Sequence, residues 1–217
     1  MSLSFSEHTA VVGGSFNPPH IGHLEAIAGV KANPNVARVV VVPSYGTPLK
    51  TVSTSFDQRA EMSRIAFSDC AEIDLIEGKE KIQYTWQLLS LLGQKYPKIA
   101  FVIGTDQFES LPRWSRFPDV LAMSDWIVLL RKPKKIADLK IGIEALVSKR
   151  ILTPTTDELE FQISGSKRIL RFVETTASEI SSTEIREKFA LAKKDETQRY
   201  LPRGVFEYIE RNQLYGT

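Results

Sequence analysis

The chain has 217 residues, of which 42% are apolar and 25% are charged, and its formal net charge at pH 7 is +2. This composition is typical of a globular protein and excludes the disordered and fibrous classes. The near balance of acidic and basic residues gives no electrostatic footprint for a nucleic-acid binder. Cys70 is the only cysteine, which excludes an intramolecular disulfide and a thiolate zinc cluster.

No targeting or membrane-spanning segment is expected. The longest apolar runs, residues 39–42 and 126–130, are far too short to cross a bilayer. We therefore expect a cytoplasmic protein whose partners are neither membranes nor nucleic acids. The sequence leaves open whether it forms a homo-oligomer.

Predicted strands and helices alternate along the first part of the chain. β-Branched runs bounded by Gly, Pro and Asn predict strands buried on both faces, and helical spacing of apolar residues predicts the helices between them. We expect strands over 9–12, 36–43, 72–76, 99–104 and 126–131, and helices over 22–31, 56–67 and 85–92. This alternation predicts a Rossmann-like α/β fold, a doubly wound parallel sheet with helices on both faces.

The pattern is less regular after Pro133. We expect a helix over 136–147, strands over 159–163 and 169–173, and closing helices over 183–193 and 205–212, the last started by Pro202. The chain, residues 1–217, is predicted to be a single domain in which 175–217 form a C-terminal helical part. In open sheets of this type ligands bind beyond the carboxyl ends of the strands, so the loops there are searched first.

The loop after the first predicted strand carries the strongest functional signal. Gly13 and Gly14 allow close approach to an anion, and the following helix directs its positive end at the same place. His20 and His23 lie on one side of its first turn, where two imidazoles can donate hydrogen bonds to phosphoryl oxygens. Two of the three histidines of the chain lie in this loop, which favours this role over a structural one. A zinc site is disfavoured because no third histidine or cysteine accompanies the pair.

Two segments resemble known motifs. Residues 14–23, which end in His-Ile-Gly-His, resemble the signature shared by nucleotidylyltransferases and class I aminoacyl-tRNA synthetases. Residues 180–186, Ile-Ser-Ser-Thr-Glu-Ile-Arg, resemble the second motif of the adenylyltransferases. Either Ser182 or Thr183 is expected to cap the helix that follows, and Arg186 to reach the β- and γ-phosphates of ATP.

Further stretches resemble bacterial nicotinate-mononucleotide adenylyltransferase, so the similarity spans most of the chain. They are Tyr84-Thr85, Phe56-x-x-Arg59-x-x-Met62, Gly104-Thr105-Asp106-Gln107, Leu111-Pro112-x-Trp114 and the ending from Leu201 to Tyr215. The resemblance implies that Asp106 contacts a ribose and that Tyr84, Thr85 and Trp114 hold a pyridine base. An Asp at a strand end and a Trp face suit these ligands, although core packing explains Trp114 equally well without the resemblance.

Two positions depart from that family. Leu49, in Thr47-Pro48-Leu49-Lys50, replaces a histidine that the family usually has, and Gln83 replaces the usual Ser before Tyr-Thr. A leucine neither hydrogen-bonds nor carries charge, whereas Lys50 is kept and can neutralise phosphate. Both departures lie on the side of the pyridine nucleotide.

The resemblance implies transfer of the adenylyl group of ATP to nicotinate mononucleotide, with Mg²⁺ accompanying ATP and nicotinate adenine dinucleotide and pyrophosphate as products, on the route to NAD. The expected catalytic residues are His20, His23, Arg186 and Lys50. The expected ATP-binding residues are Gly13, Gly14, Ser15, Phe16, Gly104, Asp106, Ile180, Ser182 and Thr183. The expected substrate-binding residues are Asn17, Tyr84, Thr85, Trp114 and Arg131. For the basic stretch 131–135 as a whole, a solvated loop is the favoured interpretation. No protein metal site is expected.

Several alternatives remain. A synthetase is disfavoured because the chain has no room for a tRNA-binding domain and no Lys-Met-Ser-Lys-Ser loop. Pantetheine-phosphate adenylyltransferases normally have Thr at the position of His20, and cytidylyltransferases have a different second motif. A nucleotide sensor without catalysis is disfavoured by the intact His20, His23 and Arg186. Nicotinate against nicotinamide stays open, because a few polar groups decide between a carboxylate and an amide.

Overall fold

The computed structural model describes residues 7–33, 36–46, 54–176 and 180–216. The strands are β1 (His8–Gly14), β2 (Val36–Pro43), β3 (Glu72–Ile73), β4 (Ile99–Gly104), β5 (Asp125–Arg131), β6 (Leu152–Pro154), β7 (Glu160–Ile163) and β8 (Ile169–Thr175). The α-helices are α1 (Ile21–Lys31), α2 (Phe56–Phe67), α3 (Ile76–Glu80), α4 (Thr85–Lys95), α5 (Thr105–Ser110), α6 (Lys140–Ser148), α7 (Ser182–Ala190), α8 (Lys194–Gln198) and α9 (Arg203–Arg211). Short 3₁₀ helices are η1 (Leu111–Arg113), η2 (Asp119–Met123), η3 (Ile136–Leu139) and η4 (Leu214–Gly216).

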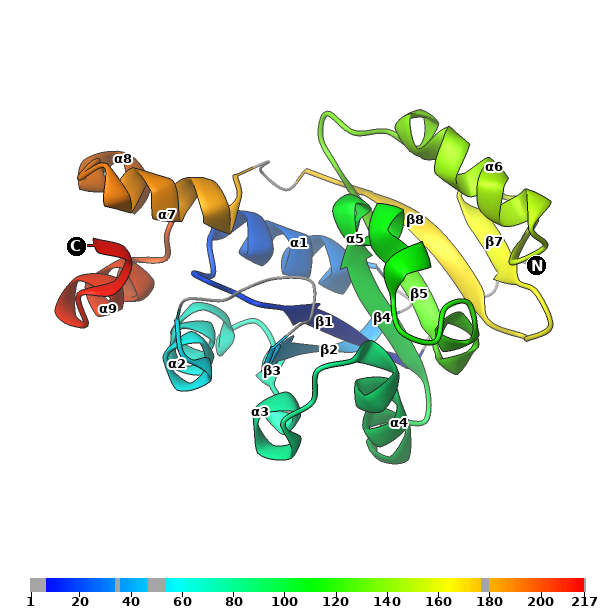
Figure 1. Ribbon diagram of the computed structural model, residues 1–217, viewed down its shortest axis with the longest axis horizontal. Helices are drawn as coiled ribbons and strands as arrows, with labels where there is room; N and C mark the ends of the chain where they lie inside the picture. Colours follow the sequence, from blue (N-terminus) through cyan, green and yellow to red (C-terminus); the bar gives the residue numbers. More distant parts are fainter. Residues whose placement is uncertain (1–6, 34–35, 47–53, 177–179, 217) are drawn as a thin grey trace.

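The strands form one sheet in the order β3-β2-β1-β4-β5-β8-β7-β6 (Figure 1). From β3 to β8 neighbouring strands are parallel, so the predicted doubly wound parallel sheet is confirmed. The order reverses at β1 and β4, and their carboxyl ends therefore border the crevice where this fold binds ligands. The last strands pair antiparallel, β8 with β7 and β7 with the edge strand β6. Residues 164–168 are too few for a parallel crossover between β7 and β8.

Alternate residues of the central strands face two separate apolar clusters. Ala10 and Val12 face a cluster that includes the buried side of α1, whereas Val11 faces a larger cluster with α4 and α6. Figure 1 shows α1 and α4 on opposite sides of the sheet. Both faces of the central strands are thus covered, which explains why their sequences are continuous apolar runs.

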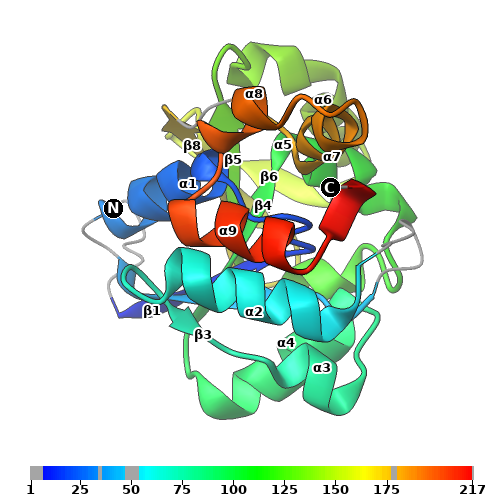
Figure 2. The same cartoon turned by 90° about the vertical axis from the view of Figure 1, so that its left-hand side faces the viewer.

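The C-terminal helices pack on α2 rather than on the sheet. Met62 of α2, Ile185 and Phe189 of α7, and Val205 and Ile209 of α9 form a third buried cluster. Figure 2 shows α9 lying alongside α2. This packing places α7 next to the carboxyl end of β1, where the first motif lies.

Several short elements differ from the prediction. The strand predicted over 72–76 is wrong beyond Ile73, because the Asp74 carboxylate accepts a hydrogen bond from the Ile76 backbone N–H (3.0 Å) and turns the chain into α3. The helix predicted over 183–193 ends at Ala190, since Ala192 has a φ of 56° and cannot continue a right-handed helix.

Other differences concern elements of a few residues. The predicted helix over 136–147 starts as the 3₁₀ helix η3 and continues as α6 to Ser148. No prediction covers α5, α8 or β6, each too short to show a period. Within the described residues, none of the helices combines the length and apolar character needed to span a membrane.

Candidate active site

His20 and His23 form a close pair at the start of α1. His20 is the N-cap residue, and its backbone N–H donates a hydrogen bond to Nδ1 of His23 (3.2 Å). The two ring centroids are 3.7 Å apart. Because Nδ1 of His23 accepts this bond, the neutral ring carries its proton on Nε2, which is then the donor available to a ligand.

Both imidazoles are held neutral. Burial, with a smaller contribution from the charge of Arg131, lowers the pKa of His20 to about 3. Burial, His20 and Arg131 together lower the pKa of His23 well below its usual value. At neutral pH the pair therefore offers N–H donors and no positive charge, and the net charge at the site comes from arginine and lysine side chains.

Arg131, at the end of β5, lies close enough to lower the pKa of both histidines, and it is only partly exposed. Its Nε is buried and has no hydrogen-bond partner in the described part of the chain. With Thr105, Asp106 and Lys134 it lines a pocket of about 160 Å³. Arg131 is the last residue of β5 rather than part of a loop, and β5 carries it to the same sheet edge as the histidines; its substrate-binding role stays a prediction.

Phe16 supports the histidine pair from the core. Its side chain is 2% exposed and meets the His23 ring edge-on, with centroids 5.0 Å apart. A Cβ at Gly14 would lie 2.9 Å from the Phe16 ring, so only glycine fits above it. Because the Phe16 side chain lies in the core, only its backbone can make the predicted contact with ATP. Gly13 and Gly14 have no side chains that would obstruct this loop.

Gly104 and Asp106 lie at the junction of β4 and α5. The Gly104 backbone N–H donates to Oε1 of Gln107 (3.0 Å), which starts the helix. A Cβ at Gly104 would lie 2.8 Å from Oδ1 of Asp106. Glycine at this position therefore allows the Asp106 carboxylate to fold back over the strand end, in the pocket that it shares with Arg131.

The second motif is joined directly to the first. The N-cap of α7 is Ser181, whose Oγ accepts from the Glu184 backbone N–H (3.1 Å), so the expected cap at Ser182 or Thr183 is wrong by one or two positions. Ser182 is instead free to donate its hydroxyl proton to the Pro18 carbonyl oxygen (2.8 Å). Ile180 packs against the C-terminal cluster.

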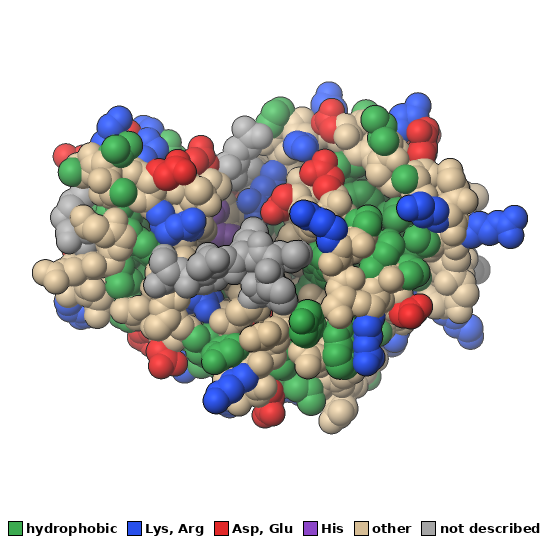
Figure 3. All heavy atoms as spheres, viewed as in Figure 1, with side chains coloured by type: hydrophobic (Ala, Val, Ile, Leu, Met, Phe, Trp, Pro, Cys, Tyr) green, Lys and Arg blue, Asp and Glu red, His purple; other side chains and the backbone are tan. Residues whose placement is uncertain are grey.

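Arg186 lies where the prediction expects it, beside the first loop. Its Nη1 donates to the Asn17 carbonyl oxygen (2.8 Å), and its Nη2 donates to Oγ1 of Thr183 (3.2 Å). Two of its five N–H donors are thereby fixed, which holds the guanidinium plane and leaves the others for a ligand. In Figure 3, histidine side chains are visible in a hollow between the C-terminal helices and the rest of the molecule, with basic side chains beside it.

Arg59 is a site residue to which the sequence analysis assigns no role, although its position in the family-like pattern was a signal. Its side chain is 1% exposed, and among the described residues its guanidinium donates to backbone carbonyls. The acceptors are those of Ser15 (2.9 Å), Ser44 (2.7 Å), Tyr45 (3.1 Å) and Thr54 (3.3 Å). Arg59 therefore joins the first loop, the loop after β2 and the start of α2. Tyr215 is a second such residue, and its hydroxyl donates to Oδ1 of Asn17 (2.6 Å).

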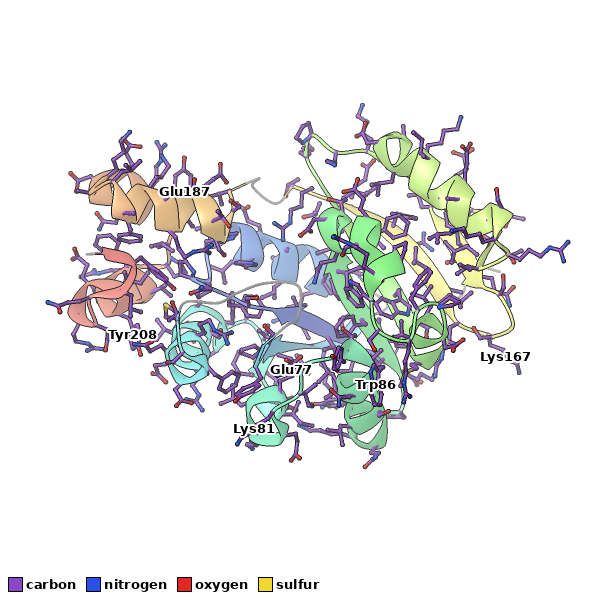
Figure 4. The ribbon with its side chains drawn as sticks, viewed as in Figure 1. Glu77, Lys81, Trp86, Lys167, Glu187 and Tyr208 are labelled. Carbon is purple, nitrogen blue, oxygen red and sulfur yellow. The ribbon has the colours of Figure 1, made fainter. Side chains whose placement is uncertain are left out.

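The residues predicted to hold a base lie around the start of α4 and η1. Tyr84 is 39% exposed at the N-cap of α4, followed by Thr85. Trp114 donates its indole N–H to Oγ of Ser110 (3.2 Å) and packs edge-on against Trp126, so its core contacts are real. The Arg116 guanidinium lies 3.6 Å over the ring of Trp86 and joins the two segments. Figure 4 labels Trp86 on α4.

The catalytic prediction for Lys50 and the departure at Leu49 fall outside the described residues. Among the described residues, no group of three or more His, Cys, Asp or Glu side chains is placed to hold a metal ion.

Comparisons with known proteins agree with this geometry. The profile of the family described as cytidylyltransferase-like matches residues 11–188. A protein of Caldicellulosiruptor saccharolyticus named "probable nicotinate-nucleotide adenylyltransferase" is 32% identical over 95% of this chain and 97% of its own length. A protein of the same name from Syntrophotalea carbinolica is 30% identical over 94% of this chain and 95% of its own.

Among solved structures, the chain is similar to Plasmodium falciparum nicotinic acid mononucleotide adenylyltransferase complexed with NaAD. The TM-score is 0.72 at 18% identity, over 96% of this chain and 97% of that one. A likeness at this identity shows the shared fold, whereas the sequence relatives show the family. The chain belongs to the cytidylyltransferase-like family and, within it, to the nicotinate-nucleotide adenylyltransferases.

Proposed function

We propose that this chain is the enzyme that transfers the adenylyl group of ATP to nicotinate mononucleotide, forming nicotinate adenine dinucleotide and pyrophosphate in NAD synthesis. The main support for the proposal is that the two motifs, residues 14–23 and 180–186, lie in contact in the fold. Neutral His20 and His23 lie at a helix start, and Arg186 is hydrogen-bonded into the same loop through Asn17. Relatives of this name cover nearly the whole chain.

The reaction needs positioning and charge stabilisation more than proton transfer. A phosphate oxygen of the mononucleotide attacks the α-phosphorus of ATP, the bond to the oxygen bridging the β-phosphorus breaks, and pyrophosphate leaves with the electron pair. The attacking phosphate is already ionised near neutral pH, so no general base is required. His20 and His23 would donate to oxygens of the α-phosphate, and Arg186 would neutralise the leaving pyrophosphate.

Mg²⁺ fits this site as a companion of ATP. The ion usually keeps several water ligands and is held through substrate phosphates rather than by an all-protein cage. Asp106 lines a pocket with Arg131, and an ion that arrives with the nucleotide needs no cluster of acidic protein ligands. Its contribution would be to neutralise charge between the phosphates.

We also propose roles for further residues, a cellular location and alternative acceptors. Lys50 would add a positive charge, and Tyr84, Thr85 and Trp114 would hold the pyridine ring. A cytoplasmic location and a homo-oligomeric state are compatible with the sequence. A different phosphorylated acceptor, nicotinamide mononucleotide or 4′-phosphopantetheine, would use the same ATP half of the site.

The test is pyrophosphate release with MgATP and each of three acceptors: nicotinate mononucleotide, nicotinamide mononucleotide and 4′-phosphopantetheine. We expect turnover with the first, and a loss on the order of 10²–10³ in kcat for His20→Ala. Turnover with another acceptor only would keep adenylyl transfer and reject the nicotinate assignment. Binding of ATP without any turnover would favour a nucleotide sensor instead.

A further inference from the structure

Tyr215, near the end of the sequence, contacts a loop almost a whole chain length away. Its hydroxyl donates a 2.6 Å hydrogen bond to Oδ1 of Asn17, which is 198 positions earlier in the sequence. Asn17 is 5% exposed and lies between Gly14 and the histidine pair. The hydroxyl has Thr54 as a second hydrogen-bond partner. Tyr215 therefore sits where the first loop, the start of α2 and the C-terminal helices meet.

This contact has a definite orientation. Because the hydroxyl donates to Oδ1 of Asn17, the side-chain amide is held with its oxygen facing Tyr215 and its nitrogen on the other side. The two N–H donors of the amide then point away from Tyr215. The backbone of the same residue is held by Arg186, which donates to its carbonyl oxygen (2.8 Å). Both halves of Asn17 are thus fixed by the C-terminal part of the chain.

The hydroxyl stays a donor over the working pH range. Burial, partly offset by Thr54 and by the charges of Arg186 and Arg59, raises the pKa of Tyr215 to about 12. The ring packs against Phe189 of α7, with centroids 6.1 Å apart. The ring thus anchors the residue, and the hydroxyl supplies the directional bond.

We propose that Tyr215 is a positioning residue: it holds the Asn17 amide with its N–H donors turned toward the phosphate of the acceptor nucleotide. The inference rests on the proposed function, since it assigns Asn17 a phosphate ligand at the same site. It adds a residue that acts through Asn17 rather than by touching the substrate.

Tyr215→Phe removes the hydroxyl and keeps the ring against Phe189. We expect the KM for nicotinate mononucleotide to rise about three- to tenfold, the range of one net hydrogen bond, with kcat within about twofold. Direct titration of the mononucleotide should show the same loss of affinity without turnover. Tyr96→Phe is the matched control, because its hydroxyl also donates to a side-chain oxygen, Oε1 of Glu72 (3.2 Å). Tyr96 precedes β4 at the amino end of the parallel strands, whereas the first loop follows the carboxyl end of β1. Tyr96→Phe should leave both constants unchanged.

A double-variant cycle separates positioning from general support. Asn17→Ala alone should weaken mononucleotide binding, and adding Tyr215→Phe should then cost nothing further, because the two act as a unit. Losses that multiply would overturn the inference, as would a lowered melting temperature in Tyr215→Phe with unchanged KM and affinity. If the native protein shows no adenylyl transfer, the proposed function fails. If the native protein turns over and Tyr215→Phe equals it, only this inference fails.

Discussion

At the scale of single residues, the site is defined by where positive charge is placed. Burial keeps His20 and His23 neutral, so they donate hydrogen bonds without adding charge. The positive charge comes from Arg186, fixed by Asn17 and Thr183, and from Arg131, whose Nε is buried without a partner among the described residues. An arginine donor left unused beside a neutral histidine pair is well placed for an anionic ligand.

Arg131→Gln tests whether this arginine serves the site or only the surface. We expect kcat/KM for adenylyl transfer to fall by about 10²-fold, since one charged donor to a reacting phosphate would be lost. Lys132→Gln, an exposed neighbour, is the control and should change kcat/KM by less than about twofold. If both substitutions have equally small effects on kcat/KM, Arg131 has no role in adenylyl transfer and acts as an ordinary surface residue. Steady-state kinetics with saturating Mg²⁺ would decide.

At the scale of elements, the start of α7 makes hydrogen bonds both within its own first turn and to the distant first loop. Ser181 caps the helix, and its backbone N–H and hydroxyl both donate to the Glu184 carboxylate (2.8 and 2.7 Å), a reciprocal capping box. These bonds leave the next residue, Ser182, to bond Pro18. The direction of α7 and the position of the first loop are therefore set together.

Ser181→Ala removes the cap and should lower the free energy of unfolding by about 1 kcal/mol. Because α7 also holds Arg186, the KM for ATP should rise as well. Ser90→Ala, at an exposed position within α4, is the matched control and should leave stability unchanged or raise it by up to about 0.5 kcal/mol, since alanine has the higher helix propensity. Urea unfolding followed by circular dichroism gives the comparison. An equal loss in both variants would mean that the capping box contributes nothing specific.

The long elements could be predicted from the sequence and the short ones could not. The runs of β2 and β4 and the helical spacing of α2 were predicted to within one residue. The turn at Asp74 and the helix α5 depend on single side-chain hydrogen bonds, which no periodicity reveals.

The same distinction holds for the site. The motif residues His20, His23 and Arg186 were predicted to lie together, and they do. The environment of Arg131, and the roles of Arg59 and Tyr215, follow from contacts across the fold that the order of residues does not contain. The sequence motifs therefore identify the groups that we expect to meet a ligand, but not the residues that hold these groups in place.

At the scale of the whole molecule, stability should depend on pH through the buried histidines. The pKa of His20 is about 3 in the folded protein against about 6.5 in an unfolded chain, so between these values the unfolded state binds more protons. The free energy of unfolding therefore falls as the pH is lowered through this window. Glu77 acts in the opposite direction, because burial raises its pKa to about 7 and its contribution is lost as pH rises.

His20→Asn isolates the histidine contribution from that of Glu77. Between pH 7 and pH 5 the native protein should lose about 2 kcal/mol more stability than the variant, the cost of keeping one imidazole neutral against a pKa of 6.5. Chemical denaturation at several pH values provides the measurement. Parallel curves for the two proteins would show that His20 binds protons alike in the folded and unfolded states, and burial would then not be what holds it neutral.

The hydrogen bonds that close the site also bear on how the chain folds. They join residues 164, 169 and 198 positions apart, and such contacts form late because long loops must close first. An intermediate with a finished sheet but undocked C-terminal helices would lack Arg186 and Tyr215 at the first loop. Nucleotides should therefore bind only the complete fold, and by mass action they would draw partly folded chains toward it.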